Sequence, residues 1–303
     1  MTDTIAIVLA GGTASEALGS GPKALVPVAG KPILLHTIAA LEDAGVDRIF
    51  VFHDTETPLP QVIGHRPVVT CVGRDGDQRE FAAGIRFGLQ EVARLTGSDI
   101  LARTNLLFIS CDAPLADPDD YRAFLQAFVQ SGSEVAMGLA DANVVRRQLP
   151  GRRLIRIRLR GRGDAAVQTA VCLKGALLRH DGDRLHFAHW SPTEMDRVEA
   201  LLKAAREHRK GGWKIPLLVY REVLHRIDSI ASASRLMRAI LWFALGRLDL
   251  ASALNVVFDL SGVRLGVIEN EIWRLNFDVD SAADLQFATE ELERRRSLDR
   301  ATA

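Results

Sequence analysis

Backbone amides and one lysine near the start of the chain form a pattern that suits phosphate binding. The apolar, β-branched run at residues 5–9 has the length of a strand and leads directly into Ala10, Gly11 and Gly12. A strand that ends in a glycine turn presents bare N–H groups, and such groups bind phosphate oxygens. Lys23 follows after a loop of small residues, so its ammonium group can fold back over the same phosphates as a point charge.

A carboxylate follows another run of strand length. Residues 105–111 are almost continuously apolar, as strands of a buried parallel sheet are. Ligands bind beyond the carboxyl ends of parallel strands, so Asp112 is expected to face the same cleft as the glycine turn. A carboxylate there can hold Mg²⁺, which takes one or two protein carboxylates together with phosphate oxygens and water. The alternative is an aspartate that only forms a turn or caps a helix.

The elements that must position these residues alternate as strand, helix and strand, which implies right-handed crossovers and parallel pairing. The sequence therefore predicts an α/β fold. Short apolar runs predict strands at 5–9, 47–53, 67–72, 105–111, 134–139, 154–160, 165–173, 263–268 and 273–277. Helical spacing and capping signals predict helices at 32–44, 79–95, 117–130 and 283–296, with a loop at 55–66 and a disordered tail.

Three short motifs together carry a resemblance to a known family. LAGG at residues 9–12, PKAL at 22–25 and GKP at 30–32 resemble the opening of the MobA-like and sugar-phosphate nucleotidyltransferases. The resemblance implies a Rossmann-like, mostly parallel sheet with helices on both faces. The chain departs from the family pattern in the glycine-rich loop. Ala14 stands where a third glycine is expected, and Glu16 stands where an arginine normally touches the phosphates, so we expect a branch with an altered loop.

The resemblance also implies a metal site. Residues 111–115 match the family motif C-D-x-P-L, and residues 278–285 (DVDSAADL) match its second metal motif. In the second motif Asp280 aligns best with the metal-side carboxylate, and Asp278 is the runner-up. Asp112 and Asp280 are therefore expected to bind Mg²⁺. The alternative for the second run is that Asp280 or the following serine simply caps the last helix.

Lys23, Asp112 and Asp280 are the expected catalytic residues, with Lys23 stabilising the charge on the phosphates. In the resembling families, the loop and first helical turn that here hold Gln78 and Arg79 select the base. A solvated helix start is the alternative for these two residues. The residues expected to contact nucleotide are Leu9, Ala10, Gly11, Gly12, Lys23, Gln78 and Arg79.

Arginines crowd into residues 146–162. Strict alternation at 154–160 places Arg156, Arg158 and Arg160 on one face of a strand. One interpretation is a surface that recognises an acceptor phosphate or acidic lipid headgroups. The favoured interpretation is a solvated sheet face on which arginine deters edge pairing. Arginines without interleaved aromatic residues do not indicate nucleic-acid binding.

Residues 190–260 are expected to form a helical insert that a minimal nucleotidyltransferase does not need. The chain is therefore predicted to be a single domain, 1–303, with this insert inside it. Arginines near Trp242 and Phe243 are compatible with docking to a membrane surface. Such an apolar stripe is more often core or a dimer contact, so burial within the chain and a homodimer through the insert are the two alternatives.

Composition excludes several classes of protein. The chain has 303 residues, and its 38 basic residues balance its 38 acidic residues, so no global charge points to nucleic acid or membrane. The three cysteines Cys71, Cys111 and Cys172 lack disulfide or metal-ligand spacing. No apolar run approaches the ~20 residues of a membrane span, and no secretory signal is evident. A reducing cytoplasm is the expected location.

These features together favour nucleotidyl transfer from an NTP to a phosphorylated small molecule, with Mg²⁺ and release of pyrophosphate. The alternative is a nucleotide- or metabolite-binding protein of the same fold that has lost catalysis, suggested by Glu16. A third interpretation, an enzyme acting on a lipid phosphate at a membrane surface, rests only on the arginine face and on Trp242 and Phe243.

Overall fold

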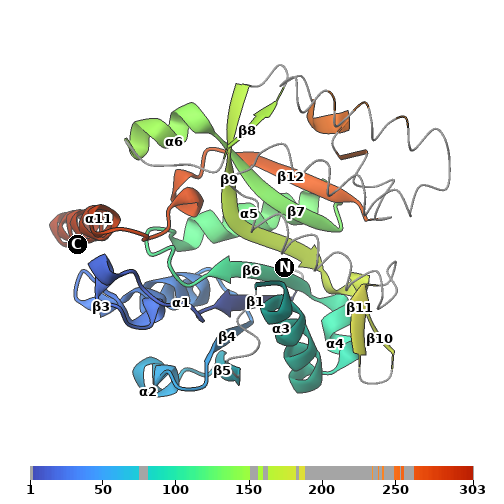
Figure 1. Cartoon of the computed structure of the whole chain (residues 1–303), viewed down its shortest axis with the longest axis horizontal. Helices are drawn as coiled ribbons and strands as arrows, with labels where there is room; N and C mark the ends of the chain where they lie inside the picture. The colour runs from blue at the N-terminus through green and yellow to red at the C-terminus, as the bar shows by residue number, and fades with distance from the viewer. Residues whose placement is uncertain are drawn as a thin grey trace.

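A sheet of eight strands forms the centre of the computed structural model (Figure 1). The structure describes residues 3–74, 81–150, 156–159, 163–181, 184–187 and 263–302, with isolated positions between 234 and 255. The strand order is β12-β7-β9-β6-β1-β4-β5, with β8 beside β9. The strands of this sheet are β1 (Thr4–Leu9), β4 (Arg48–Asp54), β5 (Val69–Arg74), β6 (Asn105–Ser110), β7 (Val135–Asp141), β8 (Arg156–Leu159), β9 (Gly163–Lys174) and β12 (Leu265–Asn270).

Most of this sheet is parallel, as the sequence predicts. β1 pairs in parallel with β4 and β6, β4 with β5, and β12 with β7. β9 is the exception, because it runs antiparallel to β6, β7 and β8. The carboxyl ends of β1, β4, β5 and β6 therefore meet at one edge of the sheet, where ligands of such folds bind.

Helices cover both faces of the sheet, and β1 shows why. Ala6 and Val8 belong to the apolar cluster packed by α1 (Ile33–Asp43) and α5 (Pro118–Ser131). Ile5 and Ile7 belong to the cluster packed by α3 (Phe81–Thr96) and α4 (Ser98–Arg103). Successive side chains of a strand point to opposite faces, so a continuous apolar run has a core on each side. The predicted Rossmann-like α/β fold class is confirmed.

A third apolar cluster joins the C-terminal part of the chain to the start of the site. It packs α6 (Ala142–Gln148) and α11 (Ala282–Thr302) with β2 (Pro27–Val28), beside β3 (Lys31–Pro32). In Figure 1, α11 is the red helix that ends at the C-terminus. Two further strands, β10 (Leu178–Asp181) and β11 (Arg184–Phe187), form a separate hairpin.

The strand predicted at 273–277 is wrong. The segment forms the 3₁₀ helix η6 (Trp273–Asn276), closed by a hydrogen bond from Phe277 N–H to Arg274 O. Leu275, Asn276 and Phe277 are buried. The apolar run therefore indicated correctly that this segment is buried, but it did not indicate its secondary structure. A short apolar run cannot distinguish a buried strand from a buried helical turn. The 3₁₀ turn leads the chain from β12 back toward Asp112.

The last helix is longer than predicted, and the expected disordered tail is wrong. α11 continues to Thr302. Glu291 pairs with Arg294 and Arg295 at helical spacing, and Arg295 also donates to Leu115 O at 2.9 Å. These contacts hold the charged turns in helical form. The loop expected at 55–66 likewise contains a short helix, α2 (Leu59–Ile63), whose two end residues are buried.

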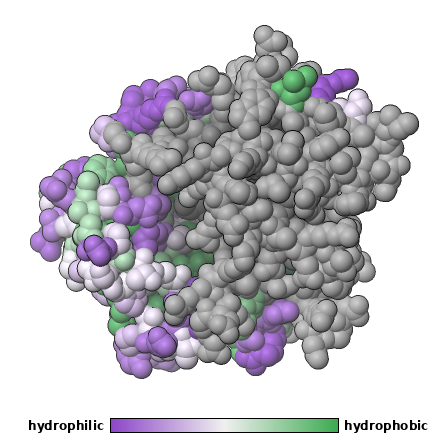
Figure 2. All heavy atoms as spheres, in the orientation of Figure 1, coloured by the Kyte–Doolittle hydropathy of each residue, from purple (hydrophilic) through white to green (hydrophobic). Residues whose placement is uncertain are grey.

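Several predictions lie largely outside the described residues. These include the helical insert at 190–260 with its dimer contact, and the base-selecting residues Gln78 and Arg79. The predicted strand of alternating arginines is confirmed as β8 for Arg156–Leu159, which pairs antiparallel with β9. On the described surface in Figure 2, hydrophilic side chains are numerous over α6 and α11, with hydrophobic ones interspersed. Within the described part of the chain, no helix combines the length and hydropathy that crossing a bilayer requires.

Candidate active site

The turn after β1 presents two backbone amides at the sheet edge. Ala10 N–H donates to Phe52 O at 2.8 Å, so this amide belongs to the sheet. Gly12 O accepts from Lys23 N–H at 2.8 Å, and Gly11 O accepts from the Arg74 guanidinium at 3.2 Å. Both glycine carbonyls are thus fixed from within the protein. In the described part of the chain the N–H groups of Gly11 and Gly12 have no acceptor, which leaves them for a ligand.

The altered loop, residues 13–22, is closed on itself. Thr13 and Pro22 form a β-bridge, and Ala14 N–H donates to Gly21 O at 2.7 Å. Ala14 is buried, whereas Glu16 is exposed in the short helix η1 (Glu16–Leu18). The side chain of Leu18 packs against the cluster that contains α11. The loop is therefore anchored to the C-terminal part of the chain.

Lys23 begins the short helix η2 (Lys23–Leu25), and its Nζ atom lies between two of the predicted metal ligands. It forms an ion pair with Asp112, and it lies 2.6 Å from Oδ1 of Asp280. Burial disfavours the ammonium form, but the carboxylates of Asp112 and Asp280 outweigh burial and raise the pKa of Lys23. The structure thus brings together Lys23, Asp112 and Asp280, the three residues predicted from the sequence to be catalytic.

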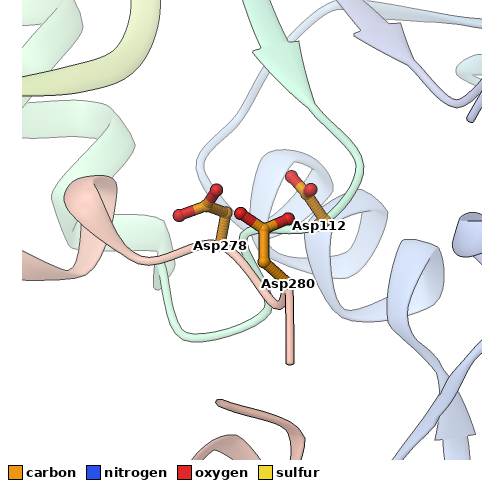
Figure 3. A group of neighbouring side chains, drawn as sticks. All are labelled: Asp112, Asp278 and Asp280. Atoms are coloured by element: carbon orange, nitrogen blue, oxygen red, sulfur yellow. The ribbon is translucent and has the colours of Figure 1, made fainter. Parts of the chain in front are cut away.

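Asp278 joins them, which the sequence offered only as the second choice. The carboxylates of Asp112, Asp278 and Asp280 each place one oxygen within 4.8 Å of the others, and Figure 3 shows the three side chains gathered together. Asp112 follows β6, whereas Asp278 and Asp280 lie in the segment that leads from η6 to α11. A hydrogen bond of 3.1 Å from Val279 N–H to Asp112 O joins the two segments directly.

Ser281, one of the two residues that the capping interpretation named, caps α11 together with Asp284, and the side chain of Asp280 takes no part in this pair. Ser281 Oγ accepts from Asp284 N–H at 3.2 Å, and Asp284 Oδ2 accepts from Ser281 N–H at 2.9 Å. This reciprocal pair is a capping box. The carboxylate of Asp280 is directed to Lys23 instead, so helix capping does not account for it.

A guanidinium fixes the second acidic segment from the other side. Arg274, in η6, donates to both oxygens of Asp120 at 2.6 and 2.7 Å and pairs with Asp117 at 2.8 Å. Asp117 and Asp120 form the capping box of α5. Because Asp117 lies five residues after Asp112, Arg274 ties the segment carrying Asp278 to the loop carrying Asp112. No sequence motif marked Arg274.

The donor set fits a hard divalent cation. Three carboxylates offer the oxygen ligands that Mg²⁺ prefers, against the single ammonium group of Lys23. Oδ1 of Asp112 is buried and has no hydrogen-bond partner, although its other oxygen pairs with Lys23. A buried carboxylate oxygen without a partner is costly, and coordination of a cation would remove that cost.

Gln168, in β9, has a structural role. β9 continues through this position with an irregularity in its pairing with β7, and Gln168 is only 3% exposed. Its side-chain amide exchanges hydrogen bonds with that of Asn270, at 2.6 and 3.1 Å, and also donates to Ile272 O. Its polar atoms are therefore committed to joining β9 to the chain after β12.

The fold and this site together define a nucleotidyltransferase-type α/β protein. Residues 6–242 match the family described as "MobA-like NTP transferase domain". This match covers more than half of the chain, so the chain belongs to the MobA-like NTP transferase family, as the motifs at 9–12, 22–25 and 30–32 predict.

Individual relatives agree with this family. The chain is 35% identical over 101 residues to 2-C-methyl-D-erythritol 4-phosphate cytidylyltransferase of Photorhabdus laumondii subsp. laumondii, a match that covers 32% of this chain and 40% of the relative. A hypothetical transferase from Thermus thermophilus is 19% identical, with TM-score 0.62 over 93% of this chain and 99% of that one. CMP:2-keto-3-deoxy-manno-octonic acid synthetase complexed with CTP is 14% identical, with TM-score 0.50 over 97% and 99%. At these identities the two structures support the fold alone.

Proposed function

We propose that this chain catalyses nucleotidyl transfer from an NTP to a phosphorylated small molecule. A phosphate or phosphonate oxygen of the acceptor forms a bond to the α-phosphorus of the NTP. The bond from that phosphorus to the oxygen bridging to the β-phosphate breaks, and pyrophosphate leaves with the electron pair. The observation that carries the proposal is the convergence of Asp112 and Asp280 on Lys23 beside the glycine turn.

This chemistry needs positioning and charge neutralisation rather than a covalent intermediate. The N–H groups of Gly11 and Gly12 bind phosphate oxygens, and Lys23 neutralises charge that develops at the α- and β-phosphates. The acceptor phosphate is already ionised near neutral pH, so no general base is required. Asp112, Asp278 and Asp280 would hold Mg²⁺, which when bound supplies further neutralisation at the phosphate oxygens.

The proposal is tested by a screen for pyrophosphate release. The four NTPs are combined, with Mg²⁺, with phosphorylated sugars, alcohols and cofactors. CTP is tested first, because the curated relative that matches this chain is named for cytidylyl transfer. Release of pyrophosphate that depends on both NTP and acceptor is the expected result. Release from no combination, by a protein that binds NTP in a thermal-shift assay, would reject transfer.

One observation favours a second candidate, a nucleotide binder without transferase activity. The exposed Glu16 places a negative charge in the glycine-rich loop, where resembling enzymes carry a positive one. The presence of Lys23 and of three converging carboxylates argues against this candidate, because a protein that only binds nucleotide does not need to keep them together. Substitution of Glu16, described in the Discussion, separates the two candidates.

A further inference from the structure

The carboxyl ends of β4 and β5 place a buried arginine beside the glycine turn. Arg74 is the last residue of β5, and its partner across the ladder is Asp54, the last residue of β4. Arg74 Nε donates to Asp54 Oδ1 at 3.3 Å, and the Arg74 side chain is only 7% exposed. A charge is costly to bury, so this position calls for a compensating role.

The guanidinium lies directly against Gly11. A Cβ atom added to Gly11 would lie 1.9 Å from Nη2 of Arg74 and 2.7 Å from its Cζ. Gly11 does not have a positive φ, so backbone conformation does not require glycine at this position. The neighbouring Gly12 has open space around the corresponding position. A Cβ atom at position 11 would therefore displace the guanidinium of Arg74, whereas the backbone conformation would tolerate it.

The contact between Arg74 and Gly11 also sets the direction of an amide. Arg74 Nη2 donates to Gly11 O at 3.2 Å. In a planar trans peptide, C=O and N–H point in opposite directions, so the N–H of Gly12 points away from Arg74. A charged donor on the carbonyl also polarises the peptide and strengthens its N–H as a donor.

We propose that Arg74 is a positioning residue that fixes the Gly11–Gly12 peptide with its N–H group toward the phosphates of the ligand. Its guanidinium holds this peptide at the carbonyl of Gly11. The glycine-rich loop of this chain has Glu16 in place of the family's arginine. This inference rests on the proposed function for the identity of the ligand, a polyphosphate. It rests on the contacts of Arg74 with Gly11 and Asp54 for its geometry.

The test measures polyphosphate affinity directly. Inorganic tripolyphosphate with Mg²⁺, the part that all NTPs share, is titrated by calorimetry into the wild type, Arg74→Gln and Arg74→Lys. Arg74→Lys keeps the charge, but one ammonium group cannot replace a fork that spans Gly11 O and Asp54. Both variants are expected to bind at least about tenfold more weakly. Wild-type affinity in either variant would overturn the inference, as would a wild type that binds no tripolyphosphate.

A matched control and a stability cycle complete the test. Arg66→Gln removes a partly buried guanidinium that pairs with Glu42 instead, and it is expected to leave affinity unchanged. Gly11→Ala is expected to lower the melting temperature more in the wild type than in the Arg74→Gln background, because the clash requires the arginine. An equal loss of melting temperature in the two backgrounds would refute the contact between Arg74 and Gly11. If Arg74→Gln does not fold, Asp54→Asn, which weakens the contact to Arg74 Nε, takes its place in both measurements and is expected to weaken binding.

These measurements separate the inference from the proposed function. A wild type that binds tripolyphosphate but transfers no nucleotide rejects the function and leaves the role of Arg74 to be judged by the variants. If the wild type transfers nucleotide and Arg74→Gln has an unchanged KM for NTP, the function stands and the inference fails. A raised KM with a smaller change in kcat is the result expected of a residue that positions the binding turn.

Discussion

The Nζ atom of Lys23 lies 2.6 Å from Oδ1 of Asp280, although 257 positions separate the two residues in the sequence. The same ammonium group pairs with Asp112. Lys23 therefore neutralises the carboxylates that are proposed to hold Mg²⁺. Lysine and metal are expected to compete for these oxygens in the free protein, and to act together once phosphates are bound.

Replacement of Lys23 by methionine is predicted to change two properties in opposite directions. The kcat for transfer should fall by about 100-fold or more, since a contact with charge developing in the transition state is worth ~3 kcal/mol. The affinity for Mn²⁺ alone should rise, because the competing ammonium group is gone. Steady-state kinetics and calorimetric titration measure the two effects. Lys31→Met, at an exposed lysine of β3, is the control, and a Lys23→Met variant with unchanged metal affinity would argue against shared carboxylates.

Stability against pH provides an independent test of the same ion pairs. Burial opposes the charged form of Lys23, but its two acidic partners raise the pKa of Lys23 above the ordinary value of 10.5. The folded protein then holds this proton more tightly than the unfolded chain. The pairs stabilise fully below the unfolded pKa, and their contribution is lost as pH rises through the folded pKa. The difference in unfolding free energy between wild type and Lys23→Met should therefore be constant from about pH 8 to about pH 10 and shrink above that range. A difference that shrinks below pH 9 in urea unfolding would contradict the raised pKa.

Arg274→Gln is predicted to destabilise the fold and loosen the acidic site. Asp120 is 5% exposed in its side chain and accepts both guanidinium hydrogen bonds, so the substitution leaves a buried carboxylate without its charged partner. The expected loss is ~3 kcal/mol in denaturant unfolding. Because Arg274 ties the segment of Asp278 to that of Asp112, the Mn²⁺ affinity of the folded variant should fall as well.

Arg122→Gln is the matched control for Arg274→Gln. It removes an arginine on the exposed surface of α5 that pairs with Asp119, which is 86% exposed. An exposed pair of this kind is worth at most about 1 kcal/mol. If the two substitutions cost the same stability, the bidentate contact between Arg274 and Asp120 does not hold the site together.

Glu16→Arg distinguishes an enzyme with a specialised loop from a binder that has lost activity. In our account Gly11, Gly12 and Lys23 already hold the phosphates, so a cation on the exposed loop competes with them and lowers kcat. In a degenerate binder, the same substitution restores a missing contact and raises NTP affinity. Affinity from a thermal-shift titration and turnover from pyrophosphate release are compared in the same variant. Tighter binding in a protein whose wild type has no turnover would favour the binder.

Much of the sheet and part of the site were accessible from sequence. The apolar runs that became β1 and β6 lie in the middle of the sheet, where burial on both faces leaves an unbroken signal. Asp112 and Asp280 could be predicted because each lies within a motif of fixed spacing, at residues 111–115 and 278–285. Those motifs could not show that Asp278 also points into the site, since that depends on the turn made by η6.

Arg74 and Arg274 were missed for a shared physical reason. Each acts through a partner far away in sequence, Gly11 for Arg74 and Asp120 for Arg274. A polar residue at the end of a strand or in a 3₁₀ turn leaves no periodic signal. The strand predicted at 67–72 stopped short of Arg74 because strand prediction ends where apolar residues end.

The central claim is that the carboxylates gathered around Lys23 serve nucleotidyl transfer, and Asp112→Asn tests it most directly. This substitution keeps the volume of the buried side chain and removes its charge. Asp119→Asn, at an exposed residue of α5, serves as the control for a lost carboxylate. The measurement is Mg²⁺-dependent pyrophosphate release with the NTP and acceptor that the screen identifies. We predict a fall in kcat of at least about 100-fold for Asp112→Asn, with an unchanged circular dichroism spectrum and normal turnover in the control. A folded Asp112→Asn protein that releases pyrophosphate at the wild-type rate would contradict the account.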